Sequence, residues 1–308
     1  MKIRFLLLLI VCSISCTESL AQEVIDSVRF SLYAKKVVAT QSAACYGDYI
    51  IFVSRLVSRM TLYNMRTKKT LYSIKLQPKT EMRGKIDVYH ANNSSFGRRK
   101  YADSDPFPLL YVSHRENNVK RGVLEVYRIL PFRRNGGKDY DSLAVEQVQT
   151  IFYPVMSDKN AMGSPWTVID PDNDYMYTYS RNNRGKASNY AKCRLSKFNI
   201  PKVGGFLNTV FLSDNDILIS SDLGFSAGMV QGACIYKGKL YIAQGVPQTN
   251  GKVYLRVVDI KKRKLIRTYN LHASGFNEEP EGCFIYKSKL MVATVKKNIY
   301  QLEIPIEK

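Results

Sequence analysis

Short runs of apolar residues separated by polar turns recur along the chain in a thirteen-residue unit. The clearest copy, QGACIYKGKLYIA at residues 231–243, has two such runs around the turn KGK. EGCFIYKSKLMVA at 281–293 and QSAACYGDYIIFV at 41–53 repeat it. Looser copies open at Trp166 and at His90, the latter with an insertion before LLYVS. A run, a tight turn and a second run predict two antiparallel strands joined by a hairpin.

The residues after the clearest copy extend this hairpin to four strands. An apolar run at 254–260, a basic turn at 261–264 and a second run at 265–271 follow, and residues 62–72 repeat this half after the first copy. Four antiparallel strands in a repeat of about 40–50 residues are typical of a β-propeller blade. Five copies therefore predict an all-β, five-bladed β-propeller. A six-bladed ring, with a degenerate blade in one of the long intervals, is the alternative.

The other blades are less regular. For the second blade we expect strands at 109–113, 122–129 and 144–152, after an insertion that contains residues 96–108. For the third we expect strands at 166–170, 175–180 and 190–198, with an outer strand somewhere between 206 and 223.

The last blade supplies three strands before the chain stops, while residues 24–32 precede the first blade without a blade of their own. We expect this N-terminal strand to complete the last blade, because closure removes open sheet edges.

The N-terminus has the pattern of an export signal. Lys2 and Arg4 precede an apolar stretch at 5–11, and small residues at 19–21 suit a cleavage site. We expect a signal peptide at 1–21, a single β-propeller domain at 22–308, and an exported protein that is periplasmic, on the cell surface or extracellular. A lipid anchor at Cys16 is the rival interpretation. No later stretch has the length of a transmembrane helix.

The net charge bears on the class of ligand, and the cysteines bear on whether the chain contains disulfides. The net charge of +20 favours an anionic partner such as an acidic polysaccharide, although it also serves solubility. Export makes nucleic acid a poor partner. Of the cysteines beyond the signal, Cys234 and Cys283 stand at different positions of their copies, which would point them to opposite blade faces. We therefore expect buried free thiols at Cys45, Cys193, Cys234 and Cys283.

The first residue of each copy is the main candidate for ligand contact. In propellers the innermost strand of each blade begins at one mouth of the central channel, which would gather Gln41, His90, Trp166, Gln231 and Glu281. These residues could bind a polar ligand, or hydrogen-bond one another and tie the inner strands together. The loops after the second strands reach the same face and are basic, with Arg55, His114, Arg115, Arg181, Arg184 and Lys296. Arginine binds carboxylate, sulfate or phosphate bidentately.

Catalysis has weaker support than binding. A glycoside hydrolase needs two carboxyl groups about 5–9.5 Å apart, and Glu281 is the axial carboxylate that the repeats supply, with Glu278 and Glu279 nearby. A polyuronate lyase needs a base, which could be His90. Asp170, Asp172 and Asp174 alternate as in a calcium loop but lack its glycine, so we expect a structural turn. No metal or cofactor is predicted.

The openings QGACIYKGKLYIA and EPEGCFIYKSKLMVA resemble those of secreted bacterial propeller proteins of the helveticin type and related families. The similarity is strongest over residues 231–302. It implies an exported propeller with an axial binding face and carries over no catalytic residue. The leading hypothesis is noncatalytic binding of an anionic glycan or other polyanion at this mouth; a polysaccharide-processing enzyme in the same funnel is the alternative.

Overall fold

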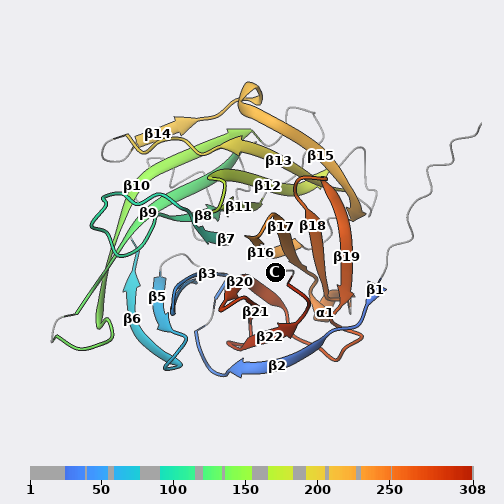
Figure 1. Cartoon of the computed structure of the whole chain (residues 1–308), viewed down its shortest axis with the longest axis horizontal. Coiled ribbons are helices and arrows are strands. Elements are labelled where there is room, and N and C mark those ends of the chain that lie inside the picture. The colour runs from blue at the N-terminus through green and yellow to red at the C-terminus, as the bar shows by residue number, and fades with distance from the viewer. Residues whose placement is uncertain are drawn as a thin grey trace, which may run out of the picture.

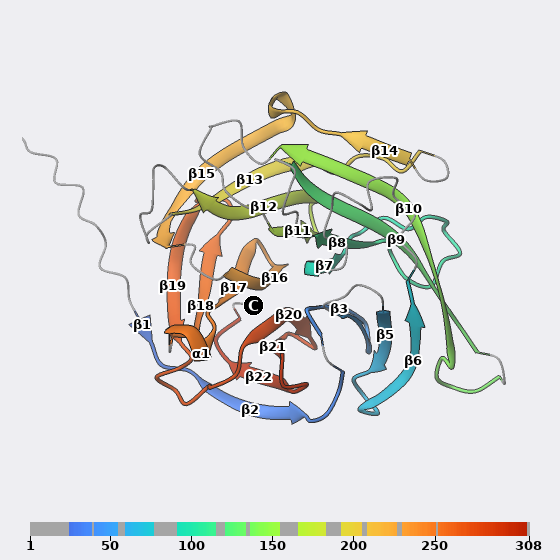
Figure 2. The same cartoon turned by 180° about the vertical axis from the view of Figure 1, so that it is seen from behind.

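Five small β-sheets stand around a central axis in the described part of the chain (Figures 1 and 2). This computed structural model describes residues 25–38, 40–54, 59–76, 91–114, 121–133, 136–154, 166–182, 192–204, 208–226, 230–250 and 252–306. The arrangement is the five-bladed β-propeller that the repeats predict, and the six-bladed alternative is excluded. The signal-peptide region and Cys16 lie outside these ranges.

The blades follow one another in sequence order around the ring, each with its first strand innermost. The strands of blade 1 are β3 (Ser42–Tyr46), β4 (Tyr49–Val53), β5 (Arg59–Asn64) and β6 (Lys69–Lys75). Blade 2 begins with β7 (Ala91–Phe96), β8 (Leu110–His114), β9 (Arg121–Phe132) and β10 (Ser142–Pro154). Blade 3 is formed by β11 (Trp166–Asp170), β12 (Tyr175–Asn182), β13 (Lys192–Asn199) and β15 (Ile217–Ser226).

The last two blades contain the most regular copies. In blade 4 lie β16 (Val230–Tyr236), β17 (Lys239–Gln244), β18 (Tyr254–Asp259) and β19 (Lys264–Asn270). Blade 5 has β20 (Pro280–Tyr286), β21 (Lys289–Thr294) and β22 (Ile299–Glu303). The helical elements described are short, namely the 3₁₀ turn η1 (Asp214–Asp216) and α1 (Pro247–Asn250).

The N-terminal segment closes the ring, as predicted, and it does so at two edges. The strand β2 (Arg29–Ala34) pairs antiparallel with β22 and completes blade 5. Just before it, β1 (Ile25–Asp26) pairs in parallel with β19, the outer strand of blade 4. Asp26 also forms an ion pair with Arg267, with 3.3 Å between Oδ2 and Nε. One segment therefore covers the exposed edges of two neighbouring blades.

The outer strand expected between residues 206 and 223 is in fact two strands in two blades. The strand β14 (Asn208–Phe211) pairs in parallel with β10 and adds a fifth strand to blade 2. The chain then passes through η1 into β15, which is the outer strand of blade 3. Phe211 stacks on Phe152, with ring centroids 5.0 Å apart. This aromatic contact holds the crossing segment on blade 2.

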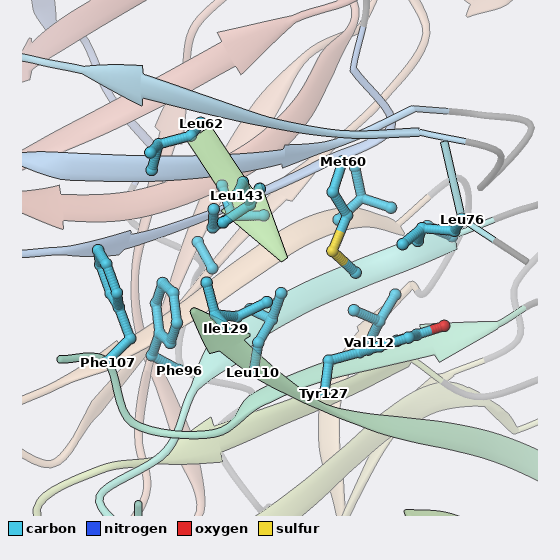
Figure 3. Packing of buried hydrophobic residues seen from close by; sticks show 14 residues of the cluster. Met60, Leu62, Leu76, Phe96, Phe107, Leu110, Val112, Tyr127, Ile129 and Leu143 are labelled. Carbon is cyan, nitrogen blue, oxygen red and sulfur yellow. The ribbon is translucent and has the colours of Figure 1, made fainter. Parts of the chain in front are cut away.

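The second strand of each blade reads as a continuous apolar run because both of its faces are buried against neighbouring blades. In β4, Ile50 and Phe52 face blade 5, whereas Ile51 and Val53 face blade 2. One cluster of buried residues fills each of the five interfaces between blades. Figure 3 shows the cluster between blades 1 and 2, where Met60 and Leu62 lie near Val112 and Ile129.

The insertion between β7 and β8 is held on the ring by two arginine–aspartate pairs. Arg99 of the insertion contacts Asp174 in the hairpin turn of blade 3, with 2.6 Å between Nε and Oδ2. Asp105 of the insertion accepts two hydrogen bonds from Arg128 on β9, at 2.9 Å and 2.7 Å. Asp105 is 3% exposed, so this fork-to-fork pair is partly removed from water.

Acid should remove the contribution of the Asp105–Arg128 pair. Its hydrogen bonds with Arg128 lower the pKa of Asp105 below the ordinary value. The pair therefore stabilises the fold fully above an unfolded pKa of about 3.9, and this stability is lost as pH falls through the lower folded pKa. At pH 7 we expect Asp105→Asn to lower the free energy of unfolding by about 1–3 kcal/mol, measured by urea denaturation.

The comparison of wild type and Asp105→Asn across pH is the control. The difference between them should begin to shrink below about pH 4, where Asp105 of the unfolded chain becomes protonated, and should vanish once pH falls below the lower folded pKa. A difference that stays constant down to pH 2 would contradict this assignment.

Candidate functional site

One face of the ring gathers the starts of the inner strands and the ends of the second strands. The pairings that bring them together are Ser42↔Val53, Ala91↔His114, Trp166↔Tyr179, Val230↔Gln244 and Pro280↔Thr294. We call this face the axial mouth. The described ends of the second strands, including Ser54 after β4, therefore lie on the same face as Gln41, Trp166, Gln231 and Glu281.

Two glutamine–glutamate pairs join neighbouring blades at the axial mouth. Gln41 of blade 1 donates to Glu281 of blade 5, and both side chains are buried. Gln231 of blade 4 donates to Glu279, with 2.8 Å between Nε2 and Oε1. Of the two roles expected for the first residues of the copies, the structural one is seen for Gln41 and Glu281, which bond each other, while Gln231 bonds Glu279 next to that pair. The pairs tie blades 1, 5 and 4 together.

Glu278 anchors the connection that enters blade 5. Its carboxylate accepts hydrogen bonds from Thr294, Asn298 and Tyr300, and the Tyr300 hydroxyl lies 2.7 Å from Oε1. Burial and this bond raise the pKa of Tyr300 to about 12, so its hydroxyl stays a donor at neutral pH. All three glutamates of the connection thus have partners within the protein.

Below the axial mouth the inner strands come into backbone contact. A Cβ atom on Gly232 would lie 2.7 Å from the Glu281 carbonyl oxygen, and one on Gly282 would lie 2.8 Å from the Ala43 Cβ. Asn93 on β7 bridges two further blades, since Nδ2 donates to the Thr167 carbonyl at 2.8 Å and Oδ1 accepts from the Ala233 N–H at 3.1 Å. The inner strands of the described blades are therefore closely packed at this level of the axis.

His114 ends β8 next to the mouth, but its side chain is fully buried between blades 1 and 2. Its Nε2 lies 2.9 Å from Oε2 of Glu125, although neither ring nitrogen has a partner with hydrogen-bond geometry in the described structure. Tyr127 donates to the same carboxylate, and Gln147 donates to it at 3.3 Å. Burial and the neighbouring Glu125 raise the pKa of Tyr127. The Glu125 cluster was missed in the sequence; the hint was a carboxylate within the apolar run GVLEVYRIL.

Blade 4 has a buried cation, Arg256, on its third strand, as blade 2 has the buried carboxylate of Glu125 on its third strand. Arg256 on β18 donates to Gln244 at 3.2 Å and to Thr268 at 2.8 Å. Its guanidinium also lies over the rings of Phe225 and Tyr254. Burial lowers the pKa of Arg256 to about 10, which still leaves it charged at neutral pH. The sequence signal for this buried cation was also an ionisable residue, Arg256, within an apolar strand.

The remaining predicted residues are described only in part. Trp166 is half-buried and stacks with Tyr179, with ring centroids 6.4 Å apart, while the Tyr179 hydroxyl donates to the Gln231 carbonyl. Arg181 belongs to β12, which ends at the axial mouth, and its side chain is not described. Lys296 is exposed in the loop after β21. The other predicted residues lie outside the described ranges: Arg55, His90, Arg115 and Arg184.

Cys234 and Cys283 correct one geometric expectation. All four cysteines are free, as expected, but only Cys193 and Cys283 are buried, whereas Cys45 and Cys234 are partly exposed. The Sγ atoms of Cys234 and Cys283 lie only 3.6 Å apart. The two side chains do occupy opposite faces of equivalent strands. Because β16 and β20 belong to adjacent blades, opposite faces are the ones that meet, and the expectation that these thiols point apart was wrong.

The aspartates that alternate before β12 form a turn, as expected. Asp170 accepts from the N–H groups of Asp172 and Asn173, at 3.1 Å and 3.3 Å, and Asp174 is the partner of Arg99. Among the residues described, no group of three or more histidine, cysteine or acidic side chains could hold a metal ion. Nor does any described helix have the length and apolar character needed to cross a membrane.

The fold and this mouth define the protein as a β-propeller, and its structural neighbours are also β-propeller proteins. The glutaminyl cyclase of Myxococcus xanthus is 8% identical with a TM-score of 0.47, covering 90% of this chain and 95% of that one. A glucose dehydrogenase is 10% identical with a TM-score of 0.46, covering 91% and 100%. BamB from Moraxella catarrhalis is 9% identical with a TM-score of 0.33, covering 85% and 71%. No protein-family model and no curated protein matches the sequence. The likeness to these structures is one of fold, and it assigns no activity to this chain.

Proposed function

We propose that the protein is an exported, noncatalytic β-propeller that binds an anionic glycan or another polyanion at its axial mouth. The observation that carries this proposal is the convergence of second-strand ends on one face. Blades 1, 2 and 3 continue from these ends into Arg55, Arg115, and the pair Arg181 and Arg184. Basic residues that follow three converging strand ends in the sequence would suit a ligand with repeated carboxylate or sulfate groups.

Gln41, Gln231 and the donors to Glu278 are uncharged and do not cancel the carboxylate charge at the mouth, so attraction of an anion would rest on the basic residues after the second strands and on the net charge. Glu281 is 4% exposed and accepts from Gln41, and Glu278 has three hydroxyl or amide donors. The protein as a whole carries a net charge of +20. A positive field of this size raises the local concentration of a polyanion and speeds its association.

The polysaccharide-processing alternative requires residues of the mouth to leave the contacts that they make in the described structure. A glycoside hydrolase that uses Glu281 would have to break its hydrogen bond with Gln41 and bring a buried carboxylate to the substrate. His90, the base that a lyase would use, lies outside the described residues. Binding without turnover leaves the Gln41–Glu281 hydrogen bond intact, which supports the proposal. The resemblance of the blade openings to secreted propellers supports export.

Arg55→Ala combined with Arg115→Ala should weaken binding to polygalacturonate. We expect the Kd to rise roughly tenfold or more, because two charge-assisted contacts are lost. The measurement is biolayer interferometry on the immobilised polymer. Wild-type binding should also weaken as salt is raised from 50 to about 300 mM, since screening shortens the reach of exposed charges.

The matched control removes two positive charges from the opposite face, with Lys69→Ala and Lys262→Ala. Equal loss of affinity in this control would show that only net charge matters, and would contradict a site at the mouth. Incubation of wild type with the polymer tests the alternative. New reducing ends, or the absorbance of unsaturated uronates, would contradict a noncatalytic protein.

A further inference from the structure

A second candidate site lies on the face opposite the axial mouth, between blades 3 and 4. A cavity of about 300 Å³ opens between the first hairpin of blade 3 and the turns of blade 4. We call it the hairpin-face pocket, and the lining residues that matter here are Tyr175, Tyr177, Lys197, Ile219, Lys261 and Arg263. Its volume is at the lower end of the range for small-ligand sites, which is about 300–1,000 Å³.

The cations of this pocket have no acidic partners. In the described structure neither Lys197, Lys261 nor Arg263 has a carboxylate within 4.0 Å. Lys197 is instead held over the ring of Tyr175, with Nζ 3.4 Å from the ring centroid. The one carboxylate in the lining, Asp170, accepts three hydrogen bonds from Asp172 and Asn173 within its own turn. Three cations thus line the cavity together with one carboxylate, that of Asp170, which is 1% exposed and bound within its own turn.

The corresponding groove between blades 4 and 5 provides a comparison within the same molecule. It has a similar volume, about 360 Å³, and Tyr241 on the second strand of blade 4 lines it as Tyr177 on the second strand of blade 3 lines the hairpin-face pocket. Two of its cations are paired, however. Lys239 lies 3.8 Å from Asp259, and Arg267 lies 3.3 Å from Asp26. Grooves of this kind follow from the repeat, but unpaired cations distinguish the one between blades 3 and 4.

We propose that the hairpin-face pocket binds a carboxylated sugar, with Lys197, Lys261 and Arg263 around its carboxylate and the tyrosine and isoleucine side chains against its ring. This site goes beyond the proposed function, because it lies on the opposite face of the ring and is independent of the mouth arginines. Burial, with Asp170 nearby, raises the pKa of Tyr177. Its hydroxyl therefore stays protonated at neutral pH and is able to donate to a bound anion.

Calorimetry with trigalacturonate tests this site. Lys197→Gln combined with Lys261→Gln should raise the Kd roughly tenfold or more, because charge-assisted hydrogen bonds are lost. Ile219→Trp should also abolish binding, since Ile219 is 38% exposed at the pocket and an indole would fill the cavity without changing charge. The methyl-esterified trisaccharide, which lacks the negative charges, should bind wild type at least tenfold more weakly.

Two controls separate this site from the mouth and from general charge. Lys69→Gln removes one charge from the same face in blade 1, and Arg55→Ala with Arg115→Ala removes the mouth arginines; both should leave trigalacturonate affinity unchanged. Unchanged affinity in the Lys197 and Lys261 variant, with its thermal melting temperature preserved, would overturn the proposal. Loss of affinity only in the mouth variant would overturn it too, while supporting the proposed function.

The thiol pair supports a second, independent inference. Cys234 and Cys283 stand on adjacent inner strands, and glycines 232 and 282 allow these strands to approach closely. Their sulfur atoms are 3.6 Å apart, whereas a disulfide bond measures about 2.05 Å. We infer that these residues form a disulfide between blades 4 and 5 when a dissolved disulfide such as oxidised glutathione is present.

The exchange balances in two steps. The thiolate of Cys234, the partly exposed member, attacks the dissolved disulfide, forms a mixed disulfide and releases one thiol. The thiolate of Cys283 then attacks the Cys234 sulfur, forms the protein disulfide and releases the second thiol. Two protein thiols are oxidised and one dissolved disulfide is reduced to two thiols. Burial raises the pKa of Cys234, so the first step should be slow at neutral pH.

Peptide mapping by mass spectrometry after oxidation of the folded chain tests this inference. We expect a cross-linked peptide that contains Cys234 and Cys283, and the same product in a variant with Cys45→Ser and Cys193→Ser. In Cys283→Ser, Cys234 should instead keep a glutathione adduct. Absence of the cross-link after prolonged oxidation, or a link from Cys234 to another cysteine, would overturn the pairing.

Discussion

Asn93→Ala should lower the free energy of unfolding by about 2–4 kcal/mol. Asn93 is fully buried at the axis, and its amide joins the Thr167 carbonyl of blade 3 to the Ala233 N–H of blade 4. Alanine removes the Asn93 amide and with it both hydrogen bonds. The Thr167 carbonyl and the Ala233 N–H then lose these bonds, and each such buried group left without a partner costs about 1–3 kcal/mol. Guanidinium denaturation followed by circular dichroism measures the change.

Asn92→Ala is the matched control. Asn92 is the neighbouring residue on the same strand and is also buried, but its side-chain Nδ2 has no hydrogen-bond partner in the described structure. We expect this variant to cost less than about 1 kcal/mol. If the two alanine variants were equally destabilised, the bridging role of Asn93 would be refuted.

Gly232→Ala should destabilise the fold by about 3 kcal/mol or prevent folding, because overpacking against backbone cannot be relieved by a side-chain rotation. The new Cβ would lie 2.7 Å from the Glu281 carbonyl oxygen and 2.8 Å from the Gly282 Cα. Both atoms belong to the inner strand of blade 5. Thermal melting and soluble yield are the measurements.

Gly238→Ala shows what backbone conformation alone costs. Gly238 has φ +70°, and a Cβ there would meet nothing within 4 Å. Its expected cost is therefore about 1–2 kcal/mol, the penalty of a left-handed conformation. A Gly232→Ala variant as stable as Gly238→Ala would mean that the inner strands are further apart than described.

The blade count and the closure of the ring were predictable because they depend on local patterns. The copies at 41–53, 231–243 and 281–293 repeat both their apolar runs and their turns, and each run proved to be a strand. The N-terminal strand belonged to no blade of its own, and the last blade had only three strands, so pairing between the two was the expected closure. Its extra pairing with blade 4 involves the short strand β1, which has no pattern of its own.

Contacts between blades were harder to predict, since they depend on which faces of adjacent strands meet. Cys234 and Cys283 were correctly assigned to opposite faces of their strands. In adjacent blades these opposite faces are the ones that meet, so the two thiols lie close together instead of apart. The run Asn92 to Ser95 is the inner strand of blade 2, although its polar composition gave no sign of a buried strand. The partners of Asn93 lie in other repeats, so no local pattern specifies them.

The candidate site was predictable as a face but not as a set of contacts. Gln41, Trp166, Gln231 and Glu281 lie on one face of the ring, and Gln41 and Glu281 are hydrogen-bonded there, while His90 lies outside the described residues. His114 was expected in the loop after the second strand, but it is the last residue of β8, and its ring is buried in the interface between blades 1 and 2 beside Glu125. The alternation of side chains along β8 determines that His114 faces blade 1. Its neighbour Glu125 lies on a different strand, β9, so the sequence around His114 does not predict this contact.

Arginine-selective labelling with phenylglyoxal, measured peptide by peptide with and without polygalacturonate, tests the proposed function most directly. We predict that the polymer protects Arg55, Arg115 and Arg181 at the axial mouth from modification, while Arg66 on the opposite face is labelled equally in both samples. Equal labelling of the mouth arginines in both samples, or protection confined to Arg263, would contradict a polyanion site at the axial mouth.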